Sequence, residues 1–451
     1  MQLTFLGATQ TVTGSKYLLV VHGKKILIDC GLYQGYKNLR QRNWDKLPVD
    51  PHTIDAVLIT HAHIDHSGYI PVLLRNGYQG QIYSTEGTRT LCHILLPDSG
   101  HIQEEDAKHA NQHAYSKHHP ALPLYTYDEG LRAMSRFTTL PFHQKHQLFE
   151  DVFVEFLPAG HIIGSALIRI TAEGKSILFT GDIGRPNDPL MKPPVIVTAA
   201  DYLVIESTYG DRLHGTSNPL DELEKLINQT ITAGGSVIIP AFAVGRTQDL
   251  LYYLHLLKKD QRIPNIPAYL DSPMAINASD ILSRFADEHK LSPELCKLIC
   301  NEVKYVNTPE ESKALDQNKT QKIIISASGM LEGGRILHHL KAYLPDEHST
   351  IILTGFQAGG TRGASLERHE TEIKIHGEMI PVRAKIAAMN NMSAHTDYQE
   401  LLAWCKHFKH PPRKTFIIHG DIASSESLRD KISHELGWNC IIPNYLQQEN
   451  L

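Results

Sequence analysis

Residues 60–68 read Thr-His-Ala-His-Ile-Asp-His-Ser-Gly, and this stretch decides the fold of the 451-residue chain. Three imidazoles and one carboxylate, at His61, His63, Asp65 and His66, follow an apolar segment that is typical of a β-strand. The loop is too polar for a core turn, and its alternate side chains can diverge toward two metal ions about 3.5 to 4 Å apart. The stretch therefore predicts a metal site with two ions at the end of a strand.

Four more residues of metal-ligand type lie outward from this stretch, each where an apolar strand-like segment ends. The end of a strand holds a side chain in a fixed position, which a metal site requires of its ligands. Each residue alone is equally compatible with a structural role, so their shared placement carries the argument. The four are Asp29, His161, Asp182 and His419.

Two patterns of secondary structure divide the chain. Short strands separated by turns dominate up to residue 179, whereas strands and helices alternate from about residue 201 to 354, which is typical of a parallel sheet covered by helices. Short strands then return. Residues 98–145 are polar and histidine-rich with weak helical character, so we expect the preceding helix, which starts near residue 87, to end near Leu96.

The first group of motifs resembles the metallo-β-lactamase superfamily. The group consists of the His-x-His-x-Asp-His loop, Asp29 before it, and then His161 in Ala-Gly-His and Asp182 in Thr-Gly-Asp. The loop alone occurs in many hydrolases, whereas the ordered set is far more specific.

A second group resembles, in order and context, the three additional motifs of the β-CASP nucleases. These are Glu206 in Val-Ile-Glu-Ser-Thr-Tyr-Gly, His395 in Ser-Ala-His-Thr-Asp and His419 in Ile-His-Gly-Asp. Segments 242–246, 326–330 and 354–357 are similar to the inserted domain of that family. The resemblance covers essentially the whole chain.

The resemblance implies an α/β fold in which a metallo-β-lactamase αββα sandwich is interrupted by an inserted β-CASP α/β domain with a mainly parallel sheet. We expect the metallo-β-lactamase domain at residues 1–207 and 376–451, and the β-CASP domain at residues 208–375. Because the chain begins at the catalytic domain, it is most similar to compact bacterial members related to ribonuclease J and to the cleavage-and-polyadenylation endonuclease.

The resemblance also implies two zinc ions per chain and a ligand for each position. The Asp29 carboxylate would accept the remaining N–H of a ligand imidazole and fix its tautomer. One zinc would be held by His61, His63, His161 and Asp182, and the other by Asp65, His66, Asp182 and His419.

Catalytic roles follow from the same resemblance. His395 would protonate the departing sugar oxygen, and Glu206 would orient His395 and raise its pKa by its negative charge. Asp65 and Asp182 would act through the metals and a bridging water of lowered pKa.

Glycine-containing steps before helices also suggest phosphate binding in the inserted domain, at Arg246, Ser328, Gly329 and Arg335.

These roles predict a zinc-dependent ribonuclease that hydrolyses RNA phosphodiester bonds by a two-metal mechanism in RNA processing or degradation. The expected substrate is single-stranded RNA, cut internally, trimmed from the 5′ end, or both, and a homodimer is compatible with the sequence. Two alternatives stay open: a metallo-hydrolase of a small thioester or lactone, and a nucleic-acid-binding partner subunit.

Composition limits the functional classes further. The net charge of −5 argues against bulk electrostatic binding of nucleic acid, and six scattered cysteines indicate no disulfide framework. Because no signal segment or membrane span is evident, we expect a cytoplasmic protein without a membrane partner.

Histidine is abundant, with 27 copies. Five of them lie in residues 101–119, where we expect surface or cleft residues rather than metal ligands.

Overall fold

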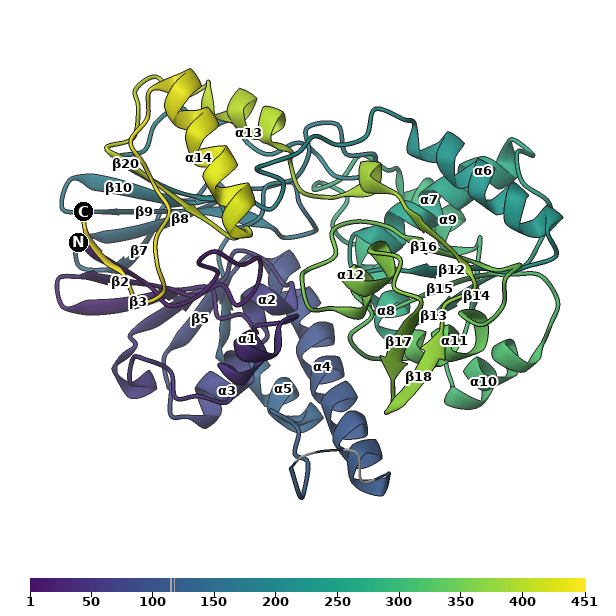
Figure 1. Cartoon of the computed structure of the whole chain (residues 1–451). Helices are drawn as coiled ribbons and strands as arrows, with labels where there is room; N and C mark the ends of the chain where they lie inside the picture. Colours follow the sequence, from purple (N-terminus) through teal and green to yellow (C-terminus); the bar gives the residue numbers. More distant parts are fainter. Residues whose placement is uncertain (114–115, 117) are drawn as a thin grey trace.

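A computed structural model of the chain describes residues 1–113, 116 and 118–451. Two bodies lie side by side, and both termini belong to the body that contains two facing sheets (Figure 1). The second body contains one six-stranded sheet and a two-stranded hairpin, and its chain enters after residue 206 and leaves after residue 388. The expected α/β architecture with an inserted domain is confirmed.

The first sheet of the two-sheet body has seven strands, of which β3 to β6 run parallel. Its N-terminal strands form an antiparallel meander that joins the two ends of the chain, because β1 pairs with β22. In spatial order the strands are β22 (Gln448–Asn450), β1 (Gln2–Phe5), β2 (Tyr17–Val21), β3 (Lys24–Ile28), β4 (Ala56–Leu58), β5 (Gln81–Ser84) and β6 (Phe137–Thr139).

The second sheet also has seven strands. Its β7 to β10 are antiparallel, and β10, β11, β20 and β21 are parallel to one another. In spatial order the strands are β21 (Cys440–Ile441), β20 (Lys414–Ile418), β11 (Tyr202–Glu206), β10 (Lys175–Phe179), β9 (Ala166–Ala172), β8 (Val152–Pro158) and β7 (His146–Phe149).

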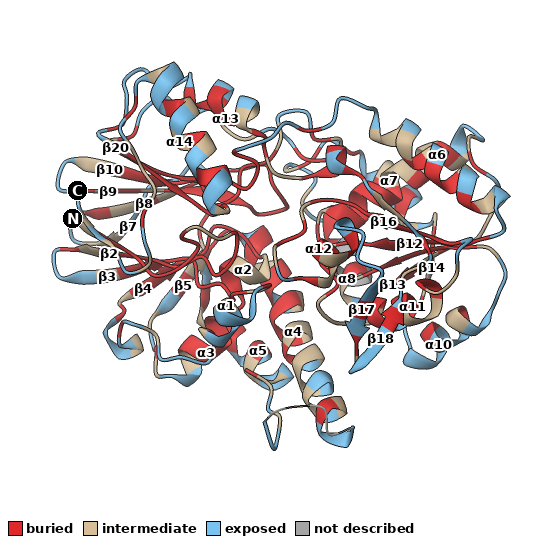
Figure 2. Cartoon of the chain, in the orientation of Figure 1, coloured by how far each residue is buried: buried red, intermediate tan, exposed pale blue. Residues whose placement is uncertain are grey.

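The two sheets pack face to face over a dry apolar layer. Alternating strand residues such as Phe5, Ile26, Ile168 and Phe179 meet there and are almost fully buried. Helices cover both outer faces, so most residues of the inner strands are buried while the helices expose one side (Figure 2). The covering helices are α2 (Ile64–Ser67), α3 (Ile70–Arg75), α4 (Glu86–Gln112), α5 (Tyr127–Ala133), α13 (Tyr398–Cys405) and α14 (Ile422–Leu436).

The inserted body has a six-stranded parallel sheet between two layers of helices. In spatial order the strands are β14 (Lys304–Tyr305), β13 (Ala268–Asp271), β15 (Ile323–Ser326), β12 (Val237–Pro240), β16 (Thr350–Leu353) and β19 (Lys385–Ala388). The helices are α6 (Pro219–Thr232), α7 (Arg246–Lys259), α8 (Pro273–Leu282), α9 (Pro293–Cys300), α10 (Pro309–Gln317), α11 (Ile336–Tyr343) and α12 (Arg362–Glu367).

The inserted body extends past the expected boundary between residues 375 and 376, because later strands pair with it. The hairpin of β17 (Glu372–Ile375) and β18 (Glu378–Pro381) packs on this body, and β19 then pairs with β16 as the edge strand of its sheet. The expected boundary precedes β19, which is short and whose place in the sheet depends on pairing with a distant strand. The remaining short elements are α1 (Lys37–Gln41), η1 (Pro51–Thr53), η2 (Met134–Arg136) and η3 (Asn390–Met392).

Helix α4 is much longer than the helix expected to end near Leu96. It continues through Pro97 to Gln112, and α5 packs along it at two glycines, Gly100 and Gly130, where a side chain would collide with the facing backbone. Tertiary packing thus stabilises a longer helix than the polar sequence of its second half predicts. Among the described residues, no helix is both long and apolar enough to cross a bilayer.

Candidate metal centre

Parallel strand pairing gathers the predicted ligands at one edge of the sandwich. Strands β3 and β4 are parallel neighbours, as are β10, β11 and β20, so the residues that follow their carboxyl ends lie together. Asp29 follows β3 and His419 follows β20, and both adopt a left-handed backbone with φ of 57° and 50°. Such strain costs about 1–3 kcal/mol and persists where the surroundings fix it, commonly at functional sites.

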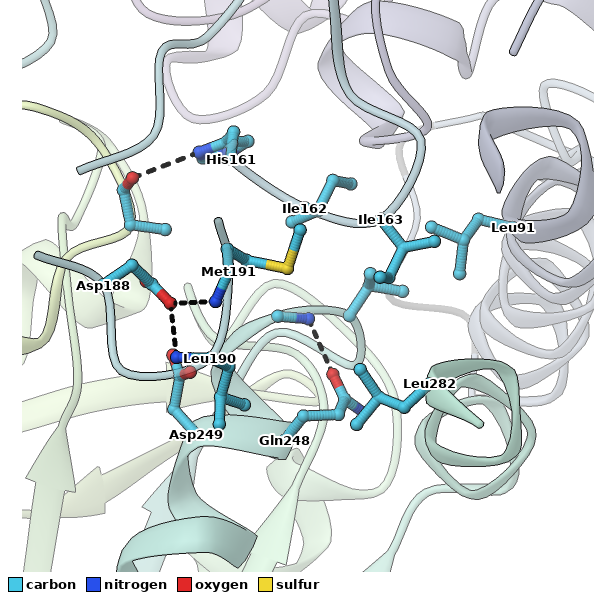
Figure 3. Close-up of a pocket in the computed structure, with 13 residues that line it drawn as sticks. Leu91, His161, Ile162, Ile163, Asp188, Leu190, Met191, Gln248, Asp249 and Leu282 are labelled. Atoms are coloured by element: carbon cyan, nitrogen blue, oxygen red, sulfur yellow. Dashed lines mark hydrogen bonds between the residues drawn. The ribbon is translucent and has the colours of Figure 1, made fainter. Parts of the chain in front are cut away.

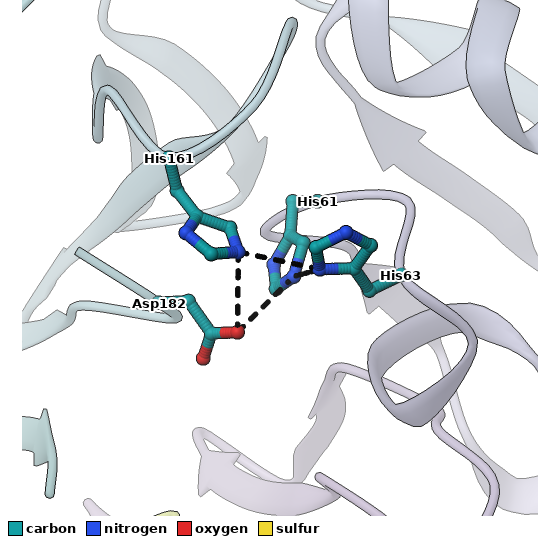
Figure 4. A group of neighbouring side chains, drawn as sticks. All are labelled: His61, His63, His161 and Asp182. Atoms are coloured by element: carbon teal, nitrogen blue, oxygen red, sulfur yellow. Dashed lines mark hydrogen bonds and ion pairs between the residues drawn. The ribbon is translucent and has the colours of Figure 1, made fainter. Parts of the chain in front are cut away.

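Three imidazoles and one carboxylate form the first group, shown in Figure 4. His61 Nε2 lies 3.1 Å from His63 Nδ1, which lies 3.3 Å from His161 Nε2. Asp182 Oδ2 lies 3.4 Å from His61 Nε2 and 3.7 Å from His161 Nε2. His61 and His63 come from the loop after β4, His161 from the turn between β8 and β9, and Asp182 from the end of β10.

The first group fits a tetrahedral metal ion. Metal–nitrogen bonds of about 2.0–2.1 Å give a tetrahedron with edges of about 3.4 Å, and the four distances given above, from 3.1 to 3.7 Å, are close to that length. Burial keeps the imidazoles neutral, the form that binds metal: it lowers the pKa of His61 to about 3 and that of His161 well below its usual value. Among the described residues, the buried His63 Nε2 and Asp182 Oδ1 have no hydrogen-bond partner.

A second group lies on the other side of Asp182. His66 Nε2 is 3.2 Å from His419 Nε2 and 3.3 Å from Asp182 Oδ1, and His419 Nε2 is 3.3 Å from Asp65 Oδ2. Asp182 therefore offers one oxygen to each group. Burial disfavours charge here, but the imidazoles of His66 and His419 outweigh it and lower the pKa of Asp65. The group fits a second cation that takes oxygen and nitrogen ligands.

Asp29 supports the second group from behind. His66 Nδ1 donates to Asp29 Oδ2 at 2.7 Å, which leaves Nε2 of the same ring for the metal side. The Thr60 amide and hydroxyl also donate to the Asp29 carboxylate, at 2.8 and 2.9 Å. Asp29 is fully buried, so these donors compensate the loss of its hydration.

A histidine–glutamate pair stands beside the first group. His395 Nδ1 donates to Glu206 Oε2 at 3.0 Å and lies 4.0 Å from Asp182 Oδ2. Burial by itself disfavours protonation of His395, but the carboxylates of Glu206 and Asp182 outweigh it and raise its pKa to about 9. Glu206 is fully buried and accepts further hydrogen bonds from the Ile183 amide at 2.7 Å and the Thr208 hydroxyl at 2.6 Å.

Thr208 is a site residue that sequence reasoning missed. Its hydroxyl donates to Glu206 and lies 3.1 Å from His419 Nδ1, so it couples the pair to the second ligand group. The residue stands in the same Glu-Ser-Thr-Tyr segment as Glu206. A hydroxyl two positions after the carboxylate was the available signal, but its partner is 211 residues away.

Family models match three consecutive parts of the chain. The model of the metallo-β-lactamase superfamily matches residues 11–231, and that of the Beta-Casp domain matches residues 247–366. The model described as the Zn-dependent metallo-hydrolase RNA specificity domain matches residues 379–443. Their order is that of a catalytic domain with an insertion.

Two relatives are similar over nearly the whole chain. Ribonuclease TTHA0252 of Thermus thermophilus is 33% identical over 93% of this chain and 93% of its own length. An RNase J-like protein of Methanocaldococcus jannaschii is 31% identical over 93% of this chain and 92% of its own length. The chain belongs to the β-CASP family of the metallo-β-lactamase superfamily. The predicted resemblance is confirmed.

More distant members and one solved structure extend the β-CASP comparison. Integrator complex subunit 11 of Danio rerio is 26% identical over 98% of this chain and 73% of its own length. A crystal structure of an Enterococcus faecalis protein of unknown function aligns with a TM-score of 0.52 at 13% identity, covering 100% of this chain and 99% of that one. That likeness concerns the fold alone.

The two arginines expected to bind phosphate are engaged inside the β-CASP body. Arg246 is 7% exposed and pairs with Asp249 at 2.7 Å. Arg335 pairs with the fully buried Asp271 at 2.6 Å and donates to the carbonyl of Val306. The structure therefore directs both guanidinium groups to protein acceptors rather than to the metal centre.

Ser328 and Gly329 lie nearer to the metal centre. Gly329 packs against the ring of Phe242, and that ring lies 6.0 Å from the ring of His63. The Ser328 hydroxyl accepts a hydrogen bond from the amide of Glu332 at 3.0 Å. This β-CASP loop thus reaches the wall of the site, and the close approach at Gly329 leaves no space for a side chain.

A pocket beside His161 joins the two bodies (Figure 3). Its walls are largely apolar, with Ile162 and Met191 on one side and Leu282 on the other. Asp188 and Asp249 also line it, and burial together with the Asp188 charge raises the pKa of Asp249 well above its usual value. Each body thus contributes one buried carboxyl group next to the first ligand group, and the charge of Arg246, which pairs with Asp249, acts on both.

The histidine-rich segment lies apart from the ligand groups. His109 contacts His113 and His376, with ring centroids 4.3 and 5.1 Å apart, and His338 lies 4.9 Å from His376. These rings join the end of α4 to the inserted body. Residues 114, 115 and 117 of the segment lie outside the described residues.

Proposed function

We propose that this chain is a zinc-dependent ribonuclease that hydrolyses RNA phosphodiester bonds with two metal ions. One observation carries the proposal: Asp182 lies between two buried ligand groups, with the His395–Glu206 pair at their side. The family supports it, since its members here include proteins named ribonuclease and RNase J-like protein. Relatives named transcription termination factor FttA and Integrator complex subunit 11 also belong to this set.

The proposed ligands are those that converge in the structure. One zinc takes His61, His63, His161 and Asp182, and the other takes Asp65, His66, Asp182 and His419. When bound, such ions lower the pKa of water to about 7 and stabilise negative charge on phosphate oxygens. Asp29 keeps the His66 ring in the orientation that presents Nε2.

His395 is the proposed general acid. Glu206 accepts a hydrogen bond from the Nδ1–H of His395, so the proton for the leaving sugar oxygen comes from Nε2. The raised pKa keeps the ring protonated at neutral pH. Because Thr208 and the Ile183 amide hold the Glu206 carboxylate, His395 is positioned by a fixed partner.

We further propose that the catalytic domain comprises residues 1–207 and the part after β19, with the β-CASP domain between them. The returning chain leaves β19 at Ala388 and passes through η3. His395 follows shortly after η3, so the end of the insertion brings it to the metal centre. Five of the seven proposed ligands are buried, and His63 and Asp65 are partly exposed, so a flexible single strand reaches such a site more readily than a stiff duplex. Single-stranded RNA is therefore the proposed substrate.

The two alternatives have less support. An inactive partner subunit would be expected to lack ligands, whereas here both groups are complete. A small-molecule hydrolase does not require the His395–Glu206 pair or the β-CASP body. Cleavage of a thioester or lactone by the zinc-loaded protein, with RNA left intact, would favour that class instead.

End-labelled RNA tests the proposal. We expect the zinc-loaded protein to release mononucleotides if it trims, or discrete fragments if it cuts internally. His395→Ala should keep two metals but lose most activity, about 10²–10⁴-fold for a lost acid. The matched control is His376→Ala, an imidazole outside both ligand groups, which should retain activity. Full activity in His395→Ala would refute the general-acid role.

A further inference from the structure

Residues 36–46 form a basic–aromatic segment on the surface of the catalytic body. The segment reads Tyr-Lys-Asn-Leu-Arg-Gln-Arg-Asn-Trp-Asp-Lys and holds four cations against one carboxylate, in a chain whose net charge is −5. Tyr36 is 54% exposed and Trp44 is 59% exposed, although both rings are large and apolar. The metal centre and its acid use none of these residues.

The segment begins beside the metal-binding loop. The Leu32 amide donates to the carbonyl of Ile64 at 2.9 Å, and Gly31 packs against the Asp65 backbone so closely that a side chain would collide with it. Tyr36 lies four residues further along, a reach of at most about 14 Å. It is therefore within a few nucleotides of the proposed cleavage site.

The segment also faces the β-CASP body. Tyr36 packs against the backbone of Gly359 and Gly360, and Arg40 lies 3.9 Å from the carboxylate of Glu332. In Figure 1, α1 lies near α2, on the side of its body that is next to α12. The exposed ring of Tyr36 thus stands where the two bodies meet.

A hollow with aromatic walls lies at the C-terminal part of the segment. Tyr33, Tyr69 and Tyr445 line it together with Arg42, Asp45 and Lys46 of the segment. The Arg42 guanidinium stacks 4.2 Å from the ring centre of Tyr445, so a cation and a flat ring are already presented together. The buried ammonium of Lys16 lies beneath, 4.8 Å from the ring centres of both Tyr33 and Tyr69.

We propose that the basic–aromatic segment is a binding surface for single-stranded RNA. Bases stack on Tyr36 and Trp44, and Lys37, Arg40 and Lys46 hold the phosphates. Proteins bind single strands by combining a cationic track with aromatic rings on which successive bases stack. This proposal rests on the proposed ribonuclease function, because it names the form of that enzyme's substrate. It also accounts for RNA binding by a chain of net negative charge, since the cations are concentrated locally.

Tryptophan fluorescence reports on the surface directly. The chain has three tryptophans, and Trp404 and Trp438 are each only 6% exposed, so Trp44 is the one that a ligand in solution can reach. The probe is a 20-nucleotide oligouridylate added to zinc-loaded His395→Ala protein, which should bind without rapid cleavage. We expect quenching that saturates with RNA and disappears in Trp44→Phe. No quenching at saturating RNA would overturn the proposal.

Affinity measurements test the two rings and the charge. Tyr36→Ala and Trp44→Ala should each weaken binding of the 20-mer about five- to hundredfold, the effect of losing one stacked base. Tyr36→Phe and Trp44→Phe should bind nearly as the parent does, which separates stacking from misfolding. The matched control is Tyr127→Ala, a ring 47% exposed on α5 away from the segment. Equal affinity in Tyr36→Ala, Trp44→Ala and Tyr127→Ala would refute the surface.

Salt and substrate form complete the test. Lys37→Gln should reduce the slope of log affinity against log salt by about 0.7, the value for one phosphate on a single strand. Equal affinity for a 20-base-pair RNA duplex would refute a stacking surface, because paired bases cannot stack on protein rings.

Failure of this proposal differs from failure of the proposed function. RNA cleavage that is unchanged in Tyr36→Ala and Trp44→Ala overturns the surface and leaves the ribonuclease intact. Quenching of Trp44 by RNA that the parent protein never cleaves supports the surface and overturns the ribonuclease.

Discussion

Replacing Glu206 by glutamine is expected to move the alkaline limb of the pH–rate profile to lower pH. His395 acts as an acid only while it is protonated, so activity falls as the pH rises through its pKa. Glu206 is the largest of the charges that favour the protonated ring. Glutamine preserves the shape of the side chain, and the Thr208 hydroxyl can turn to accept from the new amide.

The size of the shift follows from the structure. The pKa of His395 is raised from 6.5 to about 9, against the opposing effect of burial. This difference corresponds to about 3 kcal/mol at 1.36 kcal/mol per pKa unit. Because Glu206 contributes more than Asp182, we expect Glu206→Gln to move the limb by about one to two pH units. Bound metals act on His395 in both proteins, so they cancel in the comparison.

The assay is kcat/KM for a labelled oligoribonucleotide between pH 6 and 10, with metal content measured in each sample. The control is Glu129→Gln, which changes a carboxylate of the α5 capping box remote from the site. An unshifted limb in Glu206→Gln at full metal content would refute the pairing argument. A limb that also moved in Glu129→Gln would show an effect of net charge instead.

Three further predictions concern metal content and stability. Asp182→Asn should abolish turnover and lower metal content below that of the parent by elemental analysis, whereas two retained metals would contradict its shared position. Chelation should lower the thermal midpoint, since a ligand at 100 times its Kd stabilises by about 2.7 kcal/mol, and an unchanged midpoint would exclude tight binding. Asp271→Asn should cost about 3–5 kcal/mol in urea unfolding, because it breaks a buried ion pair with Arg335. The carboxylates of Asp271 and Asp316 outweigh burial and raise the pKa of His339 to about 9. The protonated ring therefore contributes its full share to the free energy of unfolding below pH 6.5 and loses it as the pH rises through 9. Asp271→Asn should flatten that pH dependence.

Much of the fold could be read from local patterns. The alternation of strands and helices predicted the parallel sheet of the inserted body, since burial on both faces and short connections act within a few dozen residues. The end of that body could not be read, because β19 belongs to it only through its pairing with β16. Helix α4 was underestimated for the same reason, as its second half depends on α5.

The sequence by itself determined which residue types stand at strand ends, and together with the family resemblance this was enough to name a set of candidate ligands that the fold brings together. Parallel pairing then places strand ends at one edge, so position in a strand already implied proximity. Tertiary structure alone decided the partners of the charged side chains. It paired Arg246 with Asp249 and Arg335 with Asp271, and it placed the Thr208 hydroxyl between Glu206 and His419. A side chain takes the partner that the fold brings within about 3 Å, and no local pattern carries that information.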